Sequence, residues 1–137
     1  MLKSAVIVKE ILVTVVNKIG VLADMSKILS DAKINIEAVA GYGKENSDEA
    51  GIMLVTNNNA KAIEVLKRNS YAALSELEVI LIELDNKPGA LETITAKIAT
   101  EGVDVRYIYG TACSGGCPAK IILSTTDNKK ALALLKS

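Results

Sequence analysis

Two kinds of hydrophobic spacing follow one another along the chain, and the succession occurs twice. Ile11–Val16 and Val79–Leu84 are dense in β-branched and aliphatic residues, which indicates strands. After each of them, apolar residues recur at the spacing of one helix face. These residues are Leu22, Met25, Leu29 and Ala32 after the first strand, and Leu91, Ile94 and Ile98 after the second. Each half of the chain therefore opens with a strand and a helix.

Further elements follow each helix in the same order. A second strand is predicted over 34–41 and 103–111, and a third over 52–56 and 121–125. A second helix comes next in each half. Its candidate N-caps are Asn58 or Asn59 in the first half, and Asp127 or Asn128 in the second. A short fourth strand is predicted over 71–77, but the second half ends at Ser137 with no counterpart to it.

An internal duplication explains this order. Asn17-Lys18-Ile19-Gly20-Val21-Leu22 returns 69 positions later as Asn86-Lys87-Pro88-Gly89-Ala90-Leu91. The unit is β-α-β-β-α-β, and right-handed crossovers place both of its helices on one face of an antiparallel sheet. We therefore predict an α+β protein of two tandem ferredoxin-like units, residues 1–76 and 77–137, the second lacking its last strand.

The end of the first helix allows a conformational prediction. Gly102 follows the first helix of the second half, at the place where a helix favours a left-handed terminating residue. Lys33 occupies the equivalent place in the first half. We therefore expect a positive φ at Lys33, although it is not a glycine.

Composition and charge exclude several function classes. The 137 residues include 16 Lys+Arg and 16 Asp+Glu, four Tyr, and no His, Phe or Trp. A neutral chain poor in aromatic residues does not favour nucleic-acid binding. Without His there is no Ser-His-Asp triad and no His metal ligand. No apolar stretch is long enough to span a membrane and no signal peptide is evident, so we expect a cytoplasmic protein with no membrane partner.

The turn between first strand and first helix resembles the ACT domain family in both halves. Asn-Lys-Pro-Gly-Ala-Leu followed by Val103-Asp104-Val105 carries the resemblance in the second half, and the first half matches it with Ile34-Asn35-Ile36. The resemblance covers nearly the whole chain. It implies a regulatory, non-catalytic protein that binds an amino acid or another small molecule at an interface between paired units. It also implies a regulated enzyme or regulator as a partner, and we expect a homodimer.

Carried over to this chain, the resemblance points to residues at the turn and at the start of the second strand. They are Asn17, Ile19, Gly20, Val21, Leu22 and Asn35 in the first copy, and Asn86, Pro88, Gly89, Ala90, Leu91 and Asp104 in the second. Elementary chemistry agrees with that location. Glycine lets a ligand approach the backbone, and the helix N-terminus favours an α-carboxylate. Asn17 or Asn86 would orient the ligand, and Asp104 would accept the α-ammonium group.

Alternatives stay open at the turn. The glycines can simply shape it, and Asn17 and Asn86 can simply cap the helix. The chain would then be an interaction or oligomerisation module without a small-molecule ligand.

The Cys113-Ser-Gly-Gly-Cys117 segment lies in a predicted hairpin loop of the second half. It can be a redox pair, two ligands of a metal, or a plain glycine-rich loop. Two thiolates are only half of a tetrahedral zinc set, and we predict no cofactor and no metal site.

Overall fold

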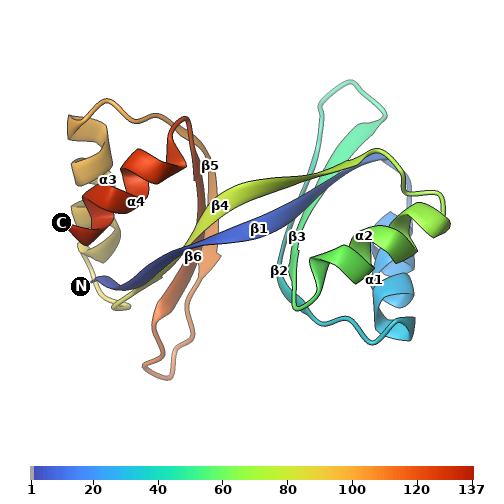
Figure 1. Ribbon diagram of the computed structural model, residues 1–137, viewed down its shortest axis with the longest axis horizontal. Coiled ribbons are helices and arrows are strands. Elements are labelled where there is room, and N and C mark those ends of the chain that lie inside the picture. Colours follow the sequence, from blue (N-terminus) through green and yellow to red (C-terminus); the bar gives the residue numbers. More distant parts are fainter. Residues whose placement is uncertain (1) are drawn as a thin grey trace. The chain divides into compact units, whose positions relative to one another are not determined.

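The computed structural model describes residues 2–137 and has the predicted alternation of strands and helices (Figure 1). The elements are β1 (Leu2–Val16), α1 (Val21–Asp31), β2 (Ile36–Gly43), β3 (Glu49–Thr56), α2 (Asn59–Arg68), β4 (Leu74–Leu84), α3 (Ala90–Thr100), β5 (Val105–Thr111), β6 (Ala119–Thr125) and α4 (Asn128–Lys136). The chain divides into two compact units. The first-repeat unit is Lys9–Leu77, and the second-repeat unit joins the residues up to Val8 to Glu78–Ser137.

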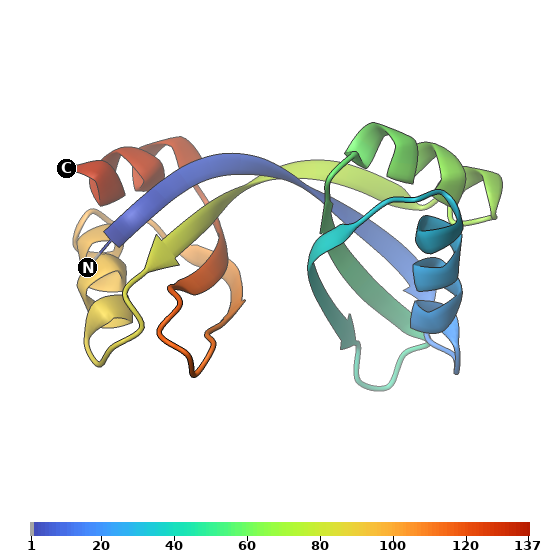
Figure 2. The same ribbon diagram turned by 90° about the horizontal axis from the view of Figure 1, so that it is seen from below.

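The first-repeat unit has the strand order β2-β3-β1-β4, and its helices α1 and α2 lie on one face of those strands (Figures 1 and 2). β1 pairs antiparallel with β3, with Ile11 opposite Leu54 and Val13 opposite Ile52. Side chains alternate between the two faces of β1, so that Ile11, Val13 and Val15 are buried under the helices while Thr14 is exposed. The hydrophobic core of this unit therefore lies between the sheet and its two helices.

The second-repeat unit has the equivalent order β1-β4-β6-β5, with α3 and α4 on one face. Among the described residues, the second repeat supplies the strands β4, β5 and β6. The N-terminal part of β1 lies beside β4 as the fourth strand of this unit (Figures 1 and 2). Ala5 is 3% exposed and belongs to the same core cluster as Ile80, Ile82 and Leu123.

The expected unit of residues 1–76 therefore differs from the compact unit at its N-terminus. Residues 2–8 belong with the second repeat. The physical reason is that β4 would otherwise present an unpaired edge and leave the core of its unit uncovered on one side. These residues precede the duplicated pattern, so the internal repeat did not indicate that they pair with the second repeat.

Both first helices end as predicted. Lys33 has φ 60° and Gly102 has φ 74°. In the first repeat, the N–H of Lys33 donates to Ser30 O at 2.9 Å and that of Ile34 to Leu29 O at 2.9 Å. These two bonds form a Schellman motif, which satisfies the last carbonyls of α1 and turns the chain into β2.

The N-termini of the second helices use a repeated Thr-Asn anchor. Asn58 is the N-cap of α2, and its Oδ1 accepts from Lys61 N–H at 3.1 Å. The neighbouring Asn59 binds two strands instead. Its Oδ1 accepts from the N–H and hydroxyl of Thr56, at 3.1 and 2.7 Å, and its Nδ2 donates to Lys9 O at 3.0 Å. Asp127, Asn128 and Thr125 repeat the arrangement in the second repeat. This anchor joins the end of the third strand to the first strand of each repeat.

Over residues 2–137, no helix combines the length and apolar character needed to cross a membrane.

The place of the N-terminal strand can be tested by charging one of its buried positions. Ala5→Asp puts an unpaired carboxylate into the core of the second-repeat unit, and we expect a loss of unfolding free energy of about 2 kcal/mol or more. Amide hydrogen exchange should rise at Ile80 and Leu123, and rise less at Leu54 in the first-repeat unit. Ser4→Asp is the matched control, because Ser4 is exposed on the same strand. Equal effects of the two variants would contradict the packing of this strand.

Candidate functional site

A cavity lies beside the glycine turn of each repeat, and most residues that line one cavity have counterparts that line the other. The second-repeat cavity has a volume of about 450 Å³ and the first-repeat cavity about 340 Å³. Each is bounded by the end of the repeat's first strand, the glycine turn, the first helix, the end of the second strand and the start of the third. Both volumes fall in the usual range of small-molecule sites.

Most of the turn residues predicted for ligand binding line these cavities. Asn17, Gly20, Val21 and Leu22 line the first-repeat cavity, and Asn86, Ala90 and Leu91 line the second-repeat cavity. Other predicted residues of the turn are exposed to solvent and do not appear among the lining side chains; they are Ile19, Pro88 and Gly89.

Asn35 and Asp104 lie at the opposite end of their units. The N–H of Asn35 donates to Asn57 Oδ1 at 2.9 Å, and that of Asp104 to Thr126 Oγ1 at 3.2 Å. In the second-repeat sheet Leu84 lies opposite Ala119 and Val105 lies opposite Thr125, so about six residues of β6, or about 20 Å, separate the turn of Asn86 from Asp104. An amino acid on the turn of Asn86 cannot also reach Asp104 of the same unit, so that predicted pairing does not fit the geometry of one unit.

Both cavities meet a helix N-terminus that no side chain caps. Gly20 (φ 92°) and Gly89 (φ 87°) are the N-caps of α1 and α3, and neither helix receives a side-chain cap. This differs from α2 and α4, which Asn58 and Asp127 cap. Asn17 and Asn86 therefore do not serve as caps. The positive end of each helix dipole faces the turn, with one acidic side chain, Asp24 or Glu92, in the first turn of the helix.

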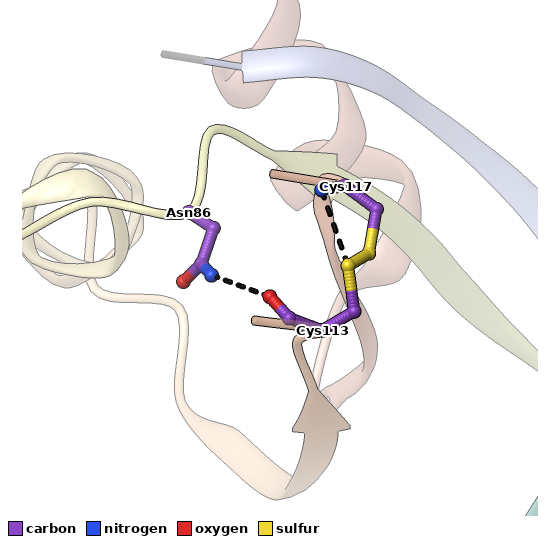
Figure 3. The surroundings of a disulfide bond; sticks show 3 residues. All are labelled: Asn86, Cys113 and Cys117. Carbon is purple, nitrogen blue, oxygen red and sulfur yellow. Dashed lines mark hydrogen bonds between the residues drawn. A yellow bond between two sulfur atoms is a disulfide. The ribbon is translucent and has the colours of Figure 1, made fainter. Parts of the chain in front are cut away.

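Asn86 is held by the neighbouring hairpin loop instead. Its Nδ2 donates to Cys113 O at 3.1 Å (Figure 3). Cys113 and Cys117 are joined by a disulfide in this structure. Among residues 2–137, no group of three or more His, Cys, Asp or Glu side chains is placed to hold a metal ion.

The walls of the two cavities differ in chemistry. The second-repeat cavity carries Asp85 and Tyr109, whose counterparts in the first repeat are Val16 and Ala40. Asp85 forms ion pairs with Lys3 at 3.5 Å and with Lys87 at 3.8 Å. The first-repeat cavity instead carries Tyr42, whose ring lies against Gly51 so closely that a Cβ there would be 2.6 Å from it. The second-repeat cavity is therefore lined by a carboxylate, and the first-repeat cavity is not.

Sequence reasoning overlooked the strand residues of the cavity walls. Gly41 and Gly110 line equivalent positions, as do Ala50 and Ala119. A signal for them existed, since each pair is identical at the 69-residue offset. Small side chains at these places keep the space beside the turn open.

A hydrogen bond between Tyr71 and Asp24 affects the electrostatics of the first turn of α1. The Tyr71 hydroxyl donates to Asp24 Oδ2 at 2.6 Å, in the first turn of that helix. This hydrogen bond to a carboxylate favours the protonated phenol and, with partial burial and the charge of Asp24, raises the pKa of Tyr71 to about 12.

Comparison with known proteins gives a consistent family. The family model described as ACT domain pair matches residues 6–135. The fold is similar to that of protein BT0572 from Bacteroides thetaiotaomicron, with a TM-score of 0.87 and 26% identity over 96% of this chain and 88% of that one. It is also similar to the ligand-free regulatory subunit of aspartate kinase from Thermus thermophilus, with a TM-score of 0.67 and 11% identity over 98% and 96% of the two chains. A search among curated proteins found no match.

The glycines of the cavity walls give a matched pair of variants. A Cβ on Gly110 would lie 2.6 Å from Lys120 O and 2.9 Å from Ile121 Cγ1, so the β5–β6 pairing must shift. We expect Gly110→Ala to reduce the unfolding free energy by about 1–3 kcal/mol in urea titrations. Gly41→Ala meets only Gly51 O at 3.7 Å and should change it by less than about 0.5 kcal/mol. Equal stability of the two variants would contradict the described packing.

The Tyr71–Asp24 pair predicts a pH dependence. The phenol is protonated in both folded and unfolded chains below pH about 10, so its contribution to stability is fully present there. As the pH rises from about 10 to about 12, the unfolded chain loses this proton first and the contribution disappears. Phenolate absorbance should show one tyrosine titrating near 12, and Asp24→Asn should move it toward 10. Asp31→Asn on the same helix is the control and should leave it near 12.

Proposed function

The chain belongs to the ACT domain pair family, and from this premise we propose that it is a non-catalytic regulatory protein whose cavities bind an amino acid. ACT domains are typically regulatory domains for small molecules such as amino acids. The observation that carries the proposal is the same in both repeats. A cavity of ligand size lies beside a glycine turn and a helix N-terminus that no side chain caps.

The second-repeat cavity offers a partner for each charged group of an amino acid. The α-carboxylate accepts hydrogen bonds from N–H groups in the first turn of α3, where the helix dipole favours an anion. The α-ammonium pairs with Asp85, which lines this cavity and takes the role that Asp104 cannot fill. Asn86 Nδ2 donates to Cys113 O, so Asn86 orients the ligand through its other polar side-chain atom, Oδ1.

The first-repeat cavity supports a weaker form of the same contacts. Gly20, Val21 and Asn17 take the places of Gly89, Ala90 and Asn86. Val16 stands where the other copy has Asp85, so no carboxylate is present there for an α-ammonium. We therefore assign amino-acid binding first to the second-repeat cavity.

A bound ligand stabilises the conformation of the protein that binds it most tightly. The resulting shift in the populations of conformations is the regulatory effect. The similar regulatory subunit of aspartate kinase suggests an enzyme as the regulated partner. A homodimer in the cytoplasm is part of the proposal, with no nucleic acid or membrane partner.

A second candidate function is an interaction or oligomerisation module without a small-molecule ligand. Exposed apolar side chains at the two cavities favour it. They are Leu22 (51% exposed), Val39 (48%), Leu91 (47%) and Ile108 (42%). Side chains of this size and exposure suit contact with another protein surface.

Binding can be tested by calorimetry and thermal shift with each of the twenty amino acids. We expect at least one to bind the wild-type chain and raise its melting temperature. Asp85→Asn should weaken that binding by about tenfold or more, because it removes a charge-assisted contact. Glu83→Gln is the matched control, because Glu83 lies on β4 two residues before Asp85, pairs with Lys120 at 3.8 Å and does not line the cavity.

If no amino acid at millimolar concentration gives heat or a melting shift, the ligand-binding proposal fails. Sedimentation then decides the alternative, because an oligomerisation module must associate without ligand. Equal loss of binding in Asp85→Asn and Glu83→Gln would place the ligand elsewhere.

A further inference from the structure

The disulfide loop of the second repeat is part of the wall of the second-repeat cavity. Thr111 and Ala112 line the cavity directly before the loop, and Ala119 lines it directly after. Cys113 and Cys117 lie between them and are exposed to solvent. Because the disulfide closes the loop at its base, it fixes the spacing between the two chain segments that form this wall.

The equivalent loop of the first repeat is closed by hydrogen bonds. Lys44 and Asp48 stand where the second repeat has Cys113 and Cys117. The N–H of Lys44 donates to Glu49 O at 3.1 Å, and the N–H of Glu49 donates to Ser47 Oγ at 3.0 Å. Hydrogen bonds therefore close this loop in the first repeat and a disulfide closes it in the second, so a reductant can open only the second loop.

The loop also holds a residue of the proposed ligand site. Asn86 Nδ2 donates to Cys113 O at 3.1 Å, and Cys117 N–H donates to Cys113 Sγ at 3.1 Å (Figure 3). Gly115 and Gly116 (φ 86°) separate the cysteines. Two adjacent glycines allow many backbone conformations once the covalent closure is lost, so the position of the Cys113 carbonyl depends on the disulfide.

This disulfide is suited to reversible chemistry. It spans a sequence separation of only four residues. So short a ring restricts the unfolded chain less than a long one does, and the effect of the bond is mainly local. Exposed disulfides are the ones that dithiol reductants reach.

We propose that Cys113–Cys117 is a redox modification site that controls the second-repeat cavity. A thiolate of a dithiol reductant attacks one sulfur, forming a mixed disulfide and releasing the other cysteine as thiolate. The second thiol of the reductant then displaces the remaining cysteine. Two electrons and two protons pass to the protein, both cysteines become thiols, and the reductant leaves as its own disulfide. Reduction releases the loop, frees Asn86 from Cys113 O and weakens binding in this cavity.

The effect on ligand affinity rests on the proposed function, but the coupling of the disulfide to Asn86 does not. NMR of the uniformly labelled full chain can measure that coupling without any ligand. On reduction with dithiothreitol, we expect the side-chain amide of Asn86 and the backbone amides of residues 84–91 to shift. Asn17 is an internal control and should not respond, because its loop contains no cysteine.

The double variant Cys113→Ser with Cys117→Ser should reproduce the spectrum of the reduced wild type around Asn86 and should not respond to dithiothreitol. Reduced wild-type chain serves as the second form if this variant folds poorly. An unchanged Asn86 amide on reduction would overturn the proposal, and so would equal shifts at Asn17 and Asn86.

A parallel titration with the amino acid that binds most tightly in the panel tests the effect on affinity. We expect the dissociation constant to rise about fivefold in the reduced chain, as for the loss of one hydrogen bond. The same constant in both redox states would overturn control of binding. If none of the twenty amino acids binds in either state while the Asn86 amide still shifts, the redox coupling stands and the proposed function fails.

Discussion

The pairing of the N-terminal strand with β4 is the constraint on which the second half of the molecule depends. Among the described residues the second repeat supplies three strands, and the N-terminal part of β1 lies beside β4 as the fourth strand of its sheet. The pairing places Ala5 in the core and brings Lys3 within 3.5 Å of Asp85. The proposed acceptor of the α-ammonium group is thus oriented by a strand more than 80 residues away in sequence. Contacts of such separation are costly to form before the rest of the unit has folded.

The two repeats share the residues that shape their turns and helix ends, but they differ in the side chains that line their cavities. Both repeats keep a glycine with positive φ before the first helix, a left-handed residue after it and the Thr-Asn anchor before the second. These groups satisfy backbone donors and acceptors, and a change at any of them would strain the fold. The side chains that line the cavity walls are not needed to satisfy backbone groups in this way. Asp85, Tyr109 and the disulfide therefore occur in the second repeat only. The two cavities are different sites on the same kind of fold.

Local signals in the sequence determined the elements, their order and the turn. Lys33 could be assigned a positive φ because the end of a helix is decided by residues within one turn of it. The glycine turns could be connected with the site because the same short string occurs twice. The family resemblance depended on the same string, and the match to the ACT domain pair agrees with it. Alternation along β1 correctly assigned the buried face, since a strand exposes its side chains to two faces in turn.

Only the tertiary structure decided which residues of different elements meet. It separated Asp104 from Asn86 by the length of a strand and placed Asp85 at the cavity. It also gave residues 2–8 to the second repeat. None of these outcomes is a property of a local segment. Each depends on strand register and on which edge remains unpaired, and both are settled by long-range backbone hydrogen bonds and core packing, which spacing along one chain does not encode.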